Sequence, residues 1–244
     1  MQIREHTIET ASGPGKMLVF GHWGQPLLAF PSEAGNIRDW EWNGMIGAVS
    51  DLVEAGRVKI YAVPSFDSES WSKTDIPTEE RARRHGPYED WIMHGAVPFI
   101  FEDQGGETGI TVAGPSLGAV HAANFCLKHG HYFSRAICLS GMYDVASLGW
   151  GEYGDAAYFN DPLAYVANLE GDHLSWLRGQ ISMILVVGSG QWEDTTGANE
   201  STHRFGALLA EKAIPHEMDV WDHNWPHDWP SWRAQIAHHL PRFV

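Results

Sequence analysis

The chain has 244 residues, of which 43% are hydrophobic and 19% are charged, a balance typical of a folded globular protein. Its formal net charge is −15, from 16 Lys and Arg against 31 Asp and Glu, and this sign opposes binding to nucleic acid or to an anionic membrane surface. No signal peptide opens the chain and no apolar run approaches the roughly 18 residues of a membrane span, so we expect a cytoplasmic protein.

Apolar runs of strand length alternate with helical patterns along the chain. The expected strands are, in order, HTIETA, KMLVFG, PLLAFPS, VKIYAVPS, GITVAGPS, RAICLSG, SMILVVGSG and HEMDVWD. Helical patterns lie near residues 39–55, 86–103, 117–129, 197–212 and 229–240. Strands first and strand–helix alternation later, with continuously apolar strands, predict an α/β fold whose mostly parallel sheet of about eight strands has helices on both faces.

Residues 142–180 are rich in Gly, Tyr and Asp and are too numerous for a simple connection. We interpret them as an irregular insertion over the carboxyl edge of the sheet. No internal repeat and no low-complexity linker divides the sequence. We therefore expect a single domain over residues 1–244.

The stretch ITVAGPSLGAVHAANFCLKHG combines an apolar strand, a Gly-Pro-Ser-Leu-Gly turn and an amphipathic helix. This order is typical of the G-x-S-x-G nucleophile elbow, in which a sharp, strained turn exposes a serine at the C-terminal edge of a sheet. Gly114 and Gly118 lack Cβ and so allow neighbouring backbone to pack close to the turn. A turn that only joins a strand to a helix is the alternative. The context favours Ser116 as a nucleophile.

A serine on an elbow needs an acid and then a histidine, in that order along the chain. The acid is expected after a later strand, where SMILVVGSGQWEDTTG offers Glu193 and Asp194. Either carboxylate could hold an imidazole in one tautomer, and one of them could instead cap the next helix. We favour Glu193, with Asp194 as the alternative acid. The histidine is expected after the last strand, in WDHNWPHDWPSW, where we favour His227 over His223 because it lies directly before the final helix.

The same segment raises the question of a metal site. His223 and His227 are four residues apart, a spacing that on one helix face would suggest a metal-binding pair. Pro226 and Pro230 argue against a helix there, because each lacks an N–H and crowds the preceding turn. We therefore expect no metal, and a serine nucleophile with an acid and a histidine needs no organic cofactor.

With these motifs the chain resembles the putative-esterase family of α/β-hydrolases, which includes S-formylglutathione hydrolases, feruloyl esterases, enterochelin esterases and antigen 85 mycolyltransferases. The resemblance runs through nearly the whole chain, in LLAFPSEAG, VKIYAVPSFDSESW, ITVAGPSLGA, ILVVGSGQWED and HDWPSWRAQI. Its most specific part is the spacing from His227 to Trp232, where the family's catalytic histidine precedes an aromatic final helix. The resemblance implies an α/β-hydrolase fold in which Ser116, Glu193 and His227 are nucleophile, acid and base.

An oxyanion hole and a substrate pocket are also expected. The backbone N–H of Leu117 should be one oxyanion donor, and the second should follow LLAFP. Pro31 has no N–H, which makes Ser32 the expected second donor, although this pair could also form only a turn. We expect Trp71 and Trp192, in loops at the carboxyl edge, to line the pocket, with simple packing against the core as the alternative.

The predicted activity is hydrolysis of small or short-chain esters, aryl esters included, by a serine carboxylesterase that forms an acyl-enzyme on Ser116. An acyltransferase with the same triad and a non-catalytic binding protein of hydrolase fold are the two alternatives. The expected partner is a small-molecule ester. The sequence leaves the existence of a homo-oligomer open.

Overall fold

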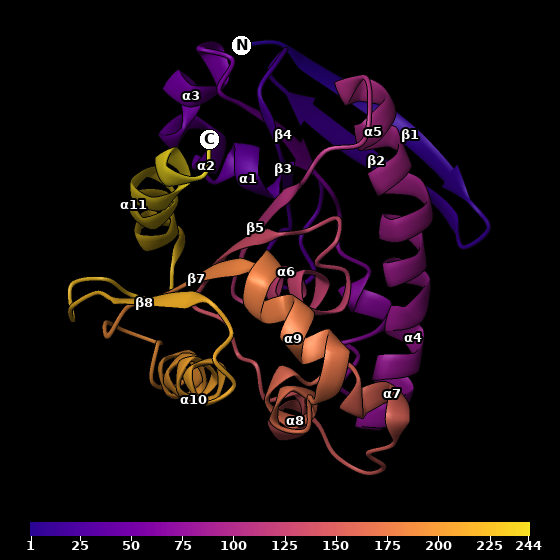
Figure 1. The fold of residues 1–244 in the computed structure, drawn as a ribbon, viewed down its shortest axis with the longest axis vertical. Helices are drawn as coiled ribbons and strands as arrows, with labels where there is room; N and C mark the ends of the chain where they lie inside the picture. Colours follow the sequence, from indigo (N-terminus) through magenta and orange to yellow (C-terminus); the bar gives the residue numbers. More distant parts are fainter.

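Eight strands form one sheet in the computed structural model, which describes residues 1–244 (Figure 1). The strands are β1 (Ile3–Thr10), β2 (Gly13–Phe20), β3 (Gln25–Ala29), β4 (Val58–Ala62), β5 (Thr111–Pro115), β6 (Arg135–Leu139), β7 (Ser182–Val187) and β8 (His216–Val220). Their spatial order is β1-β2-β4-β3-β5-β6-β7-β8, and all pairs from β4 to β8 are parallel, whereas β2 is antiparallel to both of its neighbours. The predicted α/β fold with a mostly parallel sheet is confirmed.

The central strands are apolar along their whole length because both faces of the sheet are covered. In β5, Val112 belongs to the hydrophobic core on one face and Ala113 to the core on the other. In β7, Leu185 and Ile184 divide between the two faces in the same way. Alternating side chains of a strand point to opposite faces, so a strand buried on both sides shows no polar alternation.

Helices cover each face of the sheet. One face packs against α4 (Thr78–Trp91), α5 (Val97–Gln104), α6 (Leu117–Lys128), α8 (Pro162–Ala167), α9 (Gly171–Gln180) and α10 (Ala198–Glu211). The other packs against α1 (Asp39–Trp42), α2 (Met45–Ala48), α3 (Ser50–Glu54) and α11 (Trp229–His239). No helix is both long and apolar enough to cross a lipid bilayer.

Two helical segments differ from their predicted bounds. The helix expected over 86–103 begins at Thr78 and continues from α4 through a π-helical turn into α5, with Pro87 inside α4. The first turns of α4 are charged and lack the apolar stripe that would predict a helix. They are held in place by Glu79, whose carboxylate accepts hydrogen bonds from backbone N–H groups far away in the sequence. The helix expected over 39–55 is instead three short helices, and Gly44, with φ of 77°, separates the first two.

Residues 142–180 are more helical than their composition indicates. They contain α7 (Asp155–Tyr158), α8 and α9, and only the first part, before α7, lacks an α-helix. Asp161 caps α8 by accepting from the N–H of Ala164. Among these residues, Asp144, Gly154 and Asp161 stand at N-caps of short helices, and Tyr158 and Tyr165 lie within α7 and α8.

The carboxyl ends of the parallel strands meet at one edge of the sheet. Ser116 follows β5 directly and Ser140 follows β6 directly. Glu193 lies in the turn after β7, and His227 lies between β8 and α11. Residues 30–35 follow β3. Parallel strands thus bring segments far apart in the sequence to the same place.

Candidate active site

Ser116 occupies a strained turn between β5 and α6. Its φ and ψ are 55° and −121°, a conformation that non-glycine residues rarely adopt. Its N–H donates to the carbonyl oxygen of Leu139, which ties the turn to the end of β6 (2.8 Å). A Cβ on Gly114 would lie 2.5 Å from the carbonyl carbon of Gly118, and one on Gly118 would collide with the carbonyl oxygen of Pro31. Both glycines are therefore required by close backbone approach.

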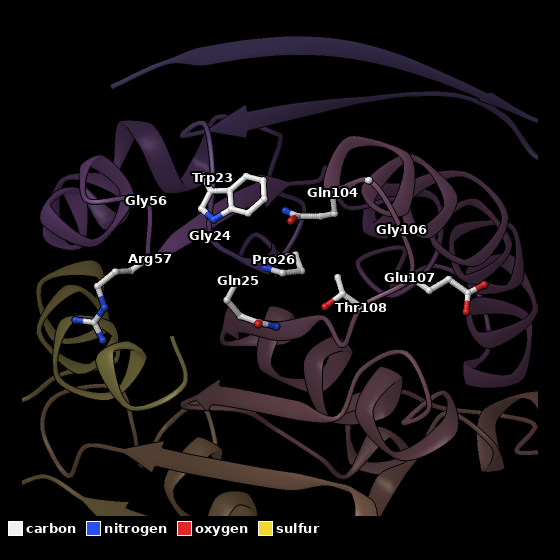
Figure 2. A pocket seen from close by; sticks show the side chains of 11 residues that line it. Trp23, Gly24, Gln25, Pro26, Gly56, Arg57, Gln104, Gly106, Glu107 and Thr108 are labelled. Carbon is white, nitrogen blue, oxygen red and sulfur yellow. The ribbon is translucent and has the colours of Figure 1, made fainter.

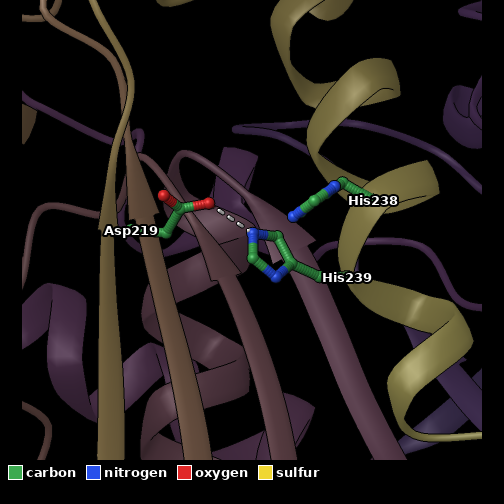
Figure 3. A group of neighbouring side chains, drawn as sticks. All are labelled: Asp219, His238 and His239. Carbon is green, nitrogen blue, oxygen red and sulfur yellow. Dashed lines mark hydrogen bonds and ion pairs between the residues drawn. The ribbon is translucent and has the colours of Figure 1, made fainter.

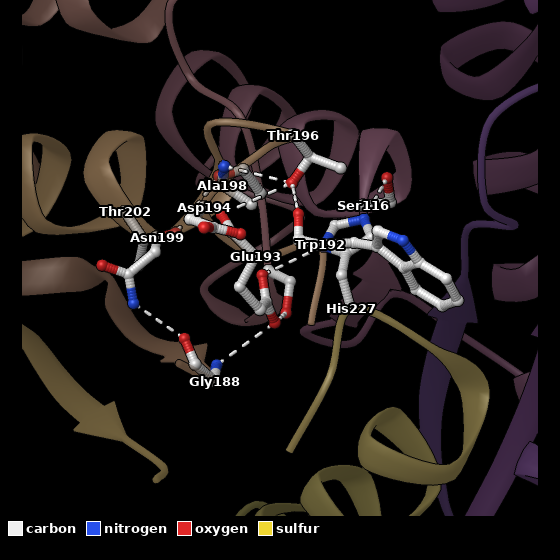
Figure 4. A network of polar contacts seen from close by, with 12 residues as sticks. Ser116, Gly188, Trp192, Glu193, Asp194, Thr196, Ala198, Asn199, Thr202 and His227 are labelled. Carbon is white, nitrogen blue, oxygen red and sulfur yellow. Dashed lines mark hydrogen bonds and ion pairs between the residues drawn. The ribbon is translucent and has the colours of Figure 1, made fainter. Parts of the chain in front are cut away.

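The side chains of Ser116, His227 and Glu193 form a continuous hydrogen-bonded series (Figure 4). Oγ of Ser116 lies 3.1 Å from Nε2 of His227, and Nδ1 of His227 lies 3.0 Å from Oε2 of Glu193. The imidazole is 11% exposed and the carboxylate is fully buried. With its proton on Nδ1, the imidazole donates to Glu193 and can accept the proton of Ser116.

The second carboxylate oxygen of Glu193 is also fixed by hydrogen bonds. Oε1 accepts from the hydroxyl of Ser140 (2.5 Å) and from the N–H of Gly188 (3.2 Å). Ser140 is fully buried and has a positive φ of 54° at the end of β6. Ser140 could not be identified from the sequence, because RAICLSG gives no sign that its serine contacts the acid. The carboxylate therefore has a partner on each oxygen.

Trp232 packs against both the histidine and this supporting serine. Its ring meets the imidazole of His227 edge to face, with centroids 5.0 Å apart and planes at 85°. Its Nε1–H donates to Oγ of Ser140 (3.2 Å). The aromatic residue of the final helix thus holds His227 on one side and the partner of Glu193 on the other.

The alternative acid and histidine lie elsewhere. Oδ1 of Asp194 accepts from the N–H of Thr195 (2.8 Å), a local bond within the turn. Asp194 and His223 both line an open surface hollow of about 410 Å³ whose lining does not include Ser116. Of the two adjacent carboxylates, the structure places Glu193 against His227.

The oxyanion donors predicted at Leu117 and Ser32 differ in their availability. Leu117 is the first residue of α6, and its N–H has no hydrogen-bond partner in the chain. By contrast, the N–H and the hydroxyl of Ser32 both donate to Oδ2 of Asp39, at 3.1 and 2.9 Å. Burial raises the pKa of Asp39, and the two bonds from Ser32 oppose that rise. The N–H of Glu33 has no partner, and Glu33 lines the cavity beside Ser116.

A buried contact between Asp67 and His121 supports the 30–35 loop. The N–H of Ala34, which has a positive φ of 53°, donates to Oδ2 of Asp67 (3.3 Å). Oδ1 of Asp67 lies 3.2 Å from Nε2 of His121, and both side chains are almost fully buried. Burial alone would raise the pKa of Asp67, but the contact with His121 outweighs it and the pKa is lowered. His121 belongs to α6, so this pair joins the loop to the helix that begins after Ser116.

A cavity of about 230 Å³ opens beside Ser116. It is lined by Glu33, Trp71, Thr74, Arg81, Ser116, Leu117, Val120, Met142 and Leu148. Trp71 is among the lining residues, whereas Trp192, also expected at the pocket, is not and has 48% of its surface exposed in the turn after β7. The cavity is smaller than the roughly 300–1,000 Å³ of sites for drug-sized ligands.

A larger hollow of about 530 Å³ lies at the opposite edge of the sheet (Figure 2). Its lining includes Gln25 at the start of β3, Arg57 just before β4 and Thr108 before β5. These are the amino ends of the strands. None of the side chains in the Ser116 series lines it.

Asp219, His238 and His239 form a cluster whose donor atoms lie within 4.8 Å of one another (Figure 3). Oδ2 of Asp219 is 2.8 Å from Nε2 of His239 and also accepts from Nε1–H of Trp221 (2.7 Å). Nδ1 of His239 faces a guanidinium N–H of Arg242 at 3.3 Å. The polar atoms of Asp219 and His239 are thus engaged with each other and with neighbouring side chains, whereas the exposed His238 makes no hydrogen bond.

Comparisons with known proteins agree with this architecture. The family model described as putative esterase matches residues 38–243. A solved ferulic acid esterase has a TM-score of 0.76 at 15% identity, over 99% of this chain and 96% of that one. An S-formylglutathione hydrolase from Agrobacterium tumefaciens has a TM-score of 0.73 at 11% identity, over 98% and 93%. Mycobacterium tuberculosis MPT51 has a TM-score of 0.70 at 12% identity, over 99% and 97%.

These structural likenesses establish the fold, since all three identities are below 25%. They confirm the α/β-hydrolase fold that the sequence resemblance implied. A comparison with curated proteins finds no matching sequence.

Proposed function

The chain belongs to the putative-esterase family, and on this premise we propose that it is a serine carboxylesterase acting through an acyl-enzyme on Ser116. The observation that carries the proposal is the hydrogen-bonded series from Ser116 through His227 to Glu193. Chance rarely places a strained serine, a histidine and a buried carboxylate in this order on separate loops of one sheet edge. The same series argues against a purely binding protein of this fold.

The first half of the reaction acylates Ser116. Nε2 of His227 takes the hydroxyl proton as Oγ attacks the ester carbonyl, and a tetrahedral intermediate with a negative oxygen forms. His227 then passes the proton to the departing alcohol. Water takes the place of the alcohol in the second half, and the same imidazole activates it to release the acid.

Backbone N–H groups would stabilise the negative oxygen. We assign one donor to Leu117, whose N–H is free at the N-terminus of α6 and benefits from the positive end of that helix. The second donor comes from the loop after β3, where the N–H of Glu33 is free and that of Ser32 is bound to Asp39. Each such donor is typically worth about 3 kcal/mol of transition-state stabilisation.

Glu193 would serve by holding the imidazole and by stabilising the cation that forms on it. Ser140 and Gly188 hold its other oxygen, so the carboxylate cannot turn away from His227 without losing hydrogen bonds. A charge-assisted bond between fixed groups needs no reorganisation during the reaction.

The size of the cavity supports small or short-chain esters, aryl esters included. About 230 Å³ leaves room for a short acyl or a single aryl group. The lining combines Trp71, Val120 and Leu148 with the reactive Ser116. Transfer to another alcohol would use the same acyl-enzyme, so the acceptor in the second half decides between hydrolysis and acyl transfer.

The proposal is tested with p-nitrophenyl esters of increasing acyl length. We expect turnover of the shortest esters, a fall in kcat/KM as the chain outgrows the cavity, and loss of turnover in Ser116→Ala. Ser175→Ala, which removes an exposed hydroxyl on α9, is the control and should retain wild-type rates. Undiminished turnover in Ser116→Ala would contradict the proposal. An added alcohol that captures the acyl group in preference to water would identify a transferase.

A further inference from the structure

Arg81 is a buried cation without an acidic partner in the cavity beside Ser116. Its exposed fraction is 3%, and it lines the cavity. The other two arginines of α4 are exposed and paired: Arg83 with Glu79 and Arg84 with Glu80. Arg81 takes part in no ion pair, since no carboxylate oxygen lies within 4.0 Å of it. Burying a charge without a counter-ion costs free energy. A buried, unpaired cation at this cavity therefore indicates that a ligand binds there.

Neutral carbonyl groups hold the guanidinium in place. Nε donates to the carbonyl oxygen of Ile76 (3.1 Å), and Nη1 donates to those of Leu148 (3.1 Å) and Trp71 (3.4 Å). Nη2 has no hydrogen-bond partner and remains accessible to solvent. Three bonds thus fix the plane of the group and leave one nitrogen, with two N–H bonds, available to a molecule in the cavity.

We propose that the substrate is a small ester carrying a carboxylate, which Nη2 of Arg81 binds while Ser116 attacks the ester carbonyl. The inference rests on the esterase function proposed above and names its substrate class. The carboxylate supplies the negative charge that Arg81 lacks, and the bond between them is charge-assisted. Such a bond changes affinity by roughly ten- to a hundredfold.

Other charges around the cavity favour a single negative charge on the ligand. Glu33 also lines the cavity, but it is exposed, so solvent screens its repulsion. The whole chain carries a net charge of −15, which disfavours a highly charged anion. Only one nitrogen of Arg81 is free. One carboxylate therefore fits the site better than a doubly charged phosphate.

The test compares esters that differ only in a carboxylate and its neutral carboxamide. One pair carries the group on the alcohol half, 4-acetoxybenzoate against 4-acetoxybenzamide. The other carries it on the acyl half, the monophenyl ester of glutaric acid against that of glutaramic acid. For at least one pair, wild-type kcat/KM should favour the carboxylate by about tenfold or more.

Variants of Arg81 then show whether this residue sets the preference. Arg81→Gln should reduce the carboxylate-to-carboxamide ratio at least tenfold, mainly through a higher KM for the anionic ester, and Arg81→Lys should retain part of it. The ratio is measured within each variant, so a smaller folded fraction cancels. Arg84→Gln, which removes an exposed positive charge from the same helix, should leave the ratio unchanged. A ratio that stays within twofold in Arg81→Gln, or no wild-type preference in either pair, would overturn the inference.

Binding measurements separate this inference from the proposed catalysis. In Ser116→Ala, calorimetry should show tighter binding of the favoured carboxylate ester than of its carboxamide, and Arg81→Gln in the same background should remove the difference. If the wild-type enzyme turned over no ester, the esterase proposal would fail, yet this binding comparison would still decide the role of Arg81. Equal binding of the two ligands would rule that role out.

Discussion

The hydroxyl of Ser140 donates a hydrogen bond to Oε1 of Glu193, the oxygen that does not contact His227. Ser140→Ala removes this donor and leaves the Nε1–H of Trp232 without its acceptor. We expect kcat to fall by about tenfold with little change in KM, because Glu193 is held less firmly and substrate contacts are untouched. Steady-state kinetics with a short aryl ester measures this, and Ser147→Ala, at an exposed site, is the control. Equal losses of kcat in both variants would contradict a specific role.

The assignment of the acid is tested by a pair of adjacent substitutions. Glu193→Gln should lower kcat by about a hundredfold or more, because an amide cannot stabilise the imidazolium as a carboxylate does. Asp194→Asn should stay within about twofold of wild type, since its carboxylate bonds only the local turn. Circular dichroism confirms that both variants are folded. The reverse pattern of losses would move the acid to Asp194.

The buried Asp67 carboxylate should matter for catalysis through the loop that it holds. Asp67→Ala removes the acceptor of the Ala34 N–H and the partner of His121. We expect a fall in kcat of about tenfold or more and weaker inhibition by a phenylboronic acid, whose tetrahedral adduct with Ser116 needs the oxyanion donors. Asp67→Asn keeps one side-chain oxygen as an acceptor. This variant should therefore recover part of the lost kcat and part of the lost affinity for the boronic acid. Unchanged boronic acid affinity in Asp67→Ala would show that the pair supports the fold alone.

Glu89 provides a prediction about pH and stability. Burial acts to raise its pKa, but hydrogen bonds from His129 (2.7 Å) and Lys128 (2.6 Å) outweigh burial and lower it to about 2. A carboxyl whose pKa is lower in the folded state stabilises the fold above its unfolded pKa, near 4.3, and loses that contribution as the pH falls toward 2.

Glu89→Gln should therefore destabilise the protein at pH 7 by up to about 3 kcal/mol, and the difference from wild type should shrink between pH 4.5 and pH 2. Urea unfolding at a series of pH values measures it. Glu80→Gln breaks an exposed pair with Arg84 and should change the free energy of unfolding by less than about 1 kcal/mol. A destabilisation by Glu89→Gln that did not vary with pH would contradict the ionic origin.

The sheet and the elbow could be predicted from the sequence because local patterns determine them. Strands buried on two faces must be apolar throughout, as the residues of β5 and β7 are. The glycines flanking Ser116 are required by backbone contacts within the turn itself and with the neighbouring loop. The motif G-x-S-x-G after a strand therefore predicts this turn.

Residues whose roles depend on distant partners could not be predicted. The role of Ser140 depends on its hydrogen bond to Glu193, which lies 53 positions later in the chain. It also depends on a positive φ that no sequence pattern indicates. Ser32 has the position expected of an oxyanion donor, but Asp39 takes its N–H. Arg81 lies among the charges of TEERARR, and only the structure distinguishes it from its paired neighbours.

The central claim is that Ser116 is the nucleophile activated by His227, and covalent labelling tests it most directly. A fluorophosphonate is incubated with the native protein, and intact mass and peptide mass spectrometry locate the adduct. We predict one adduct per chain, on the peptide that contains Ser116, with strongly slowed labelling in His227→Ala and none in Ser116→Ala. A wild-type protein that stays unlabelled, or an adduct that persists in Ser116→Ala, would contradict the account.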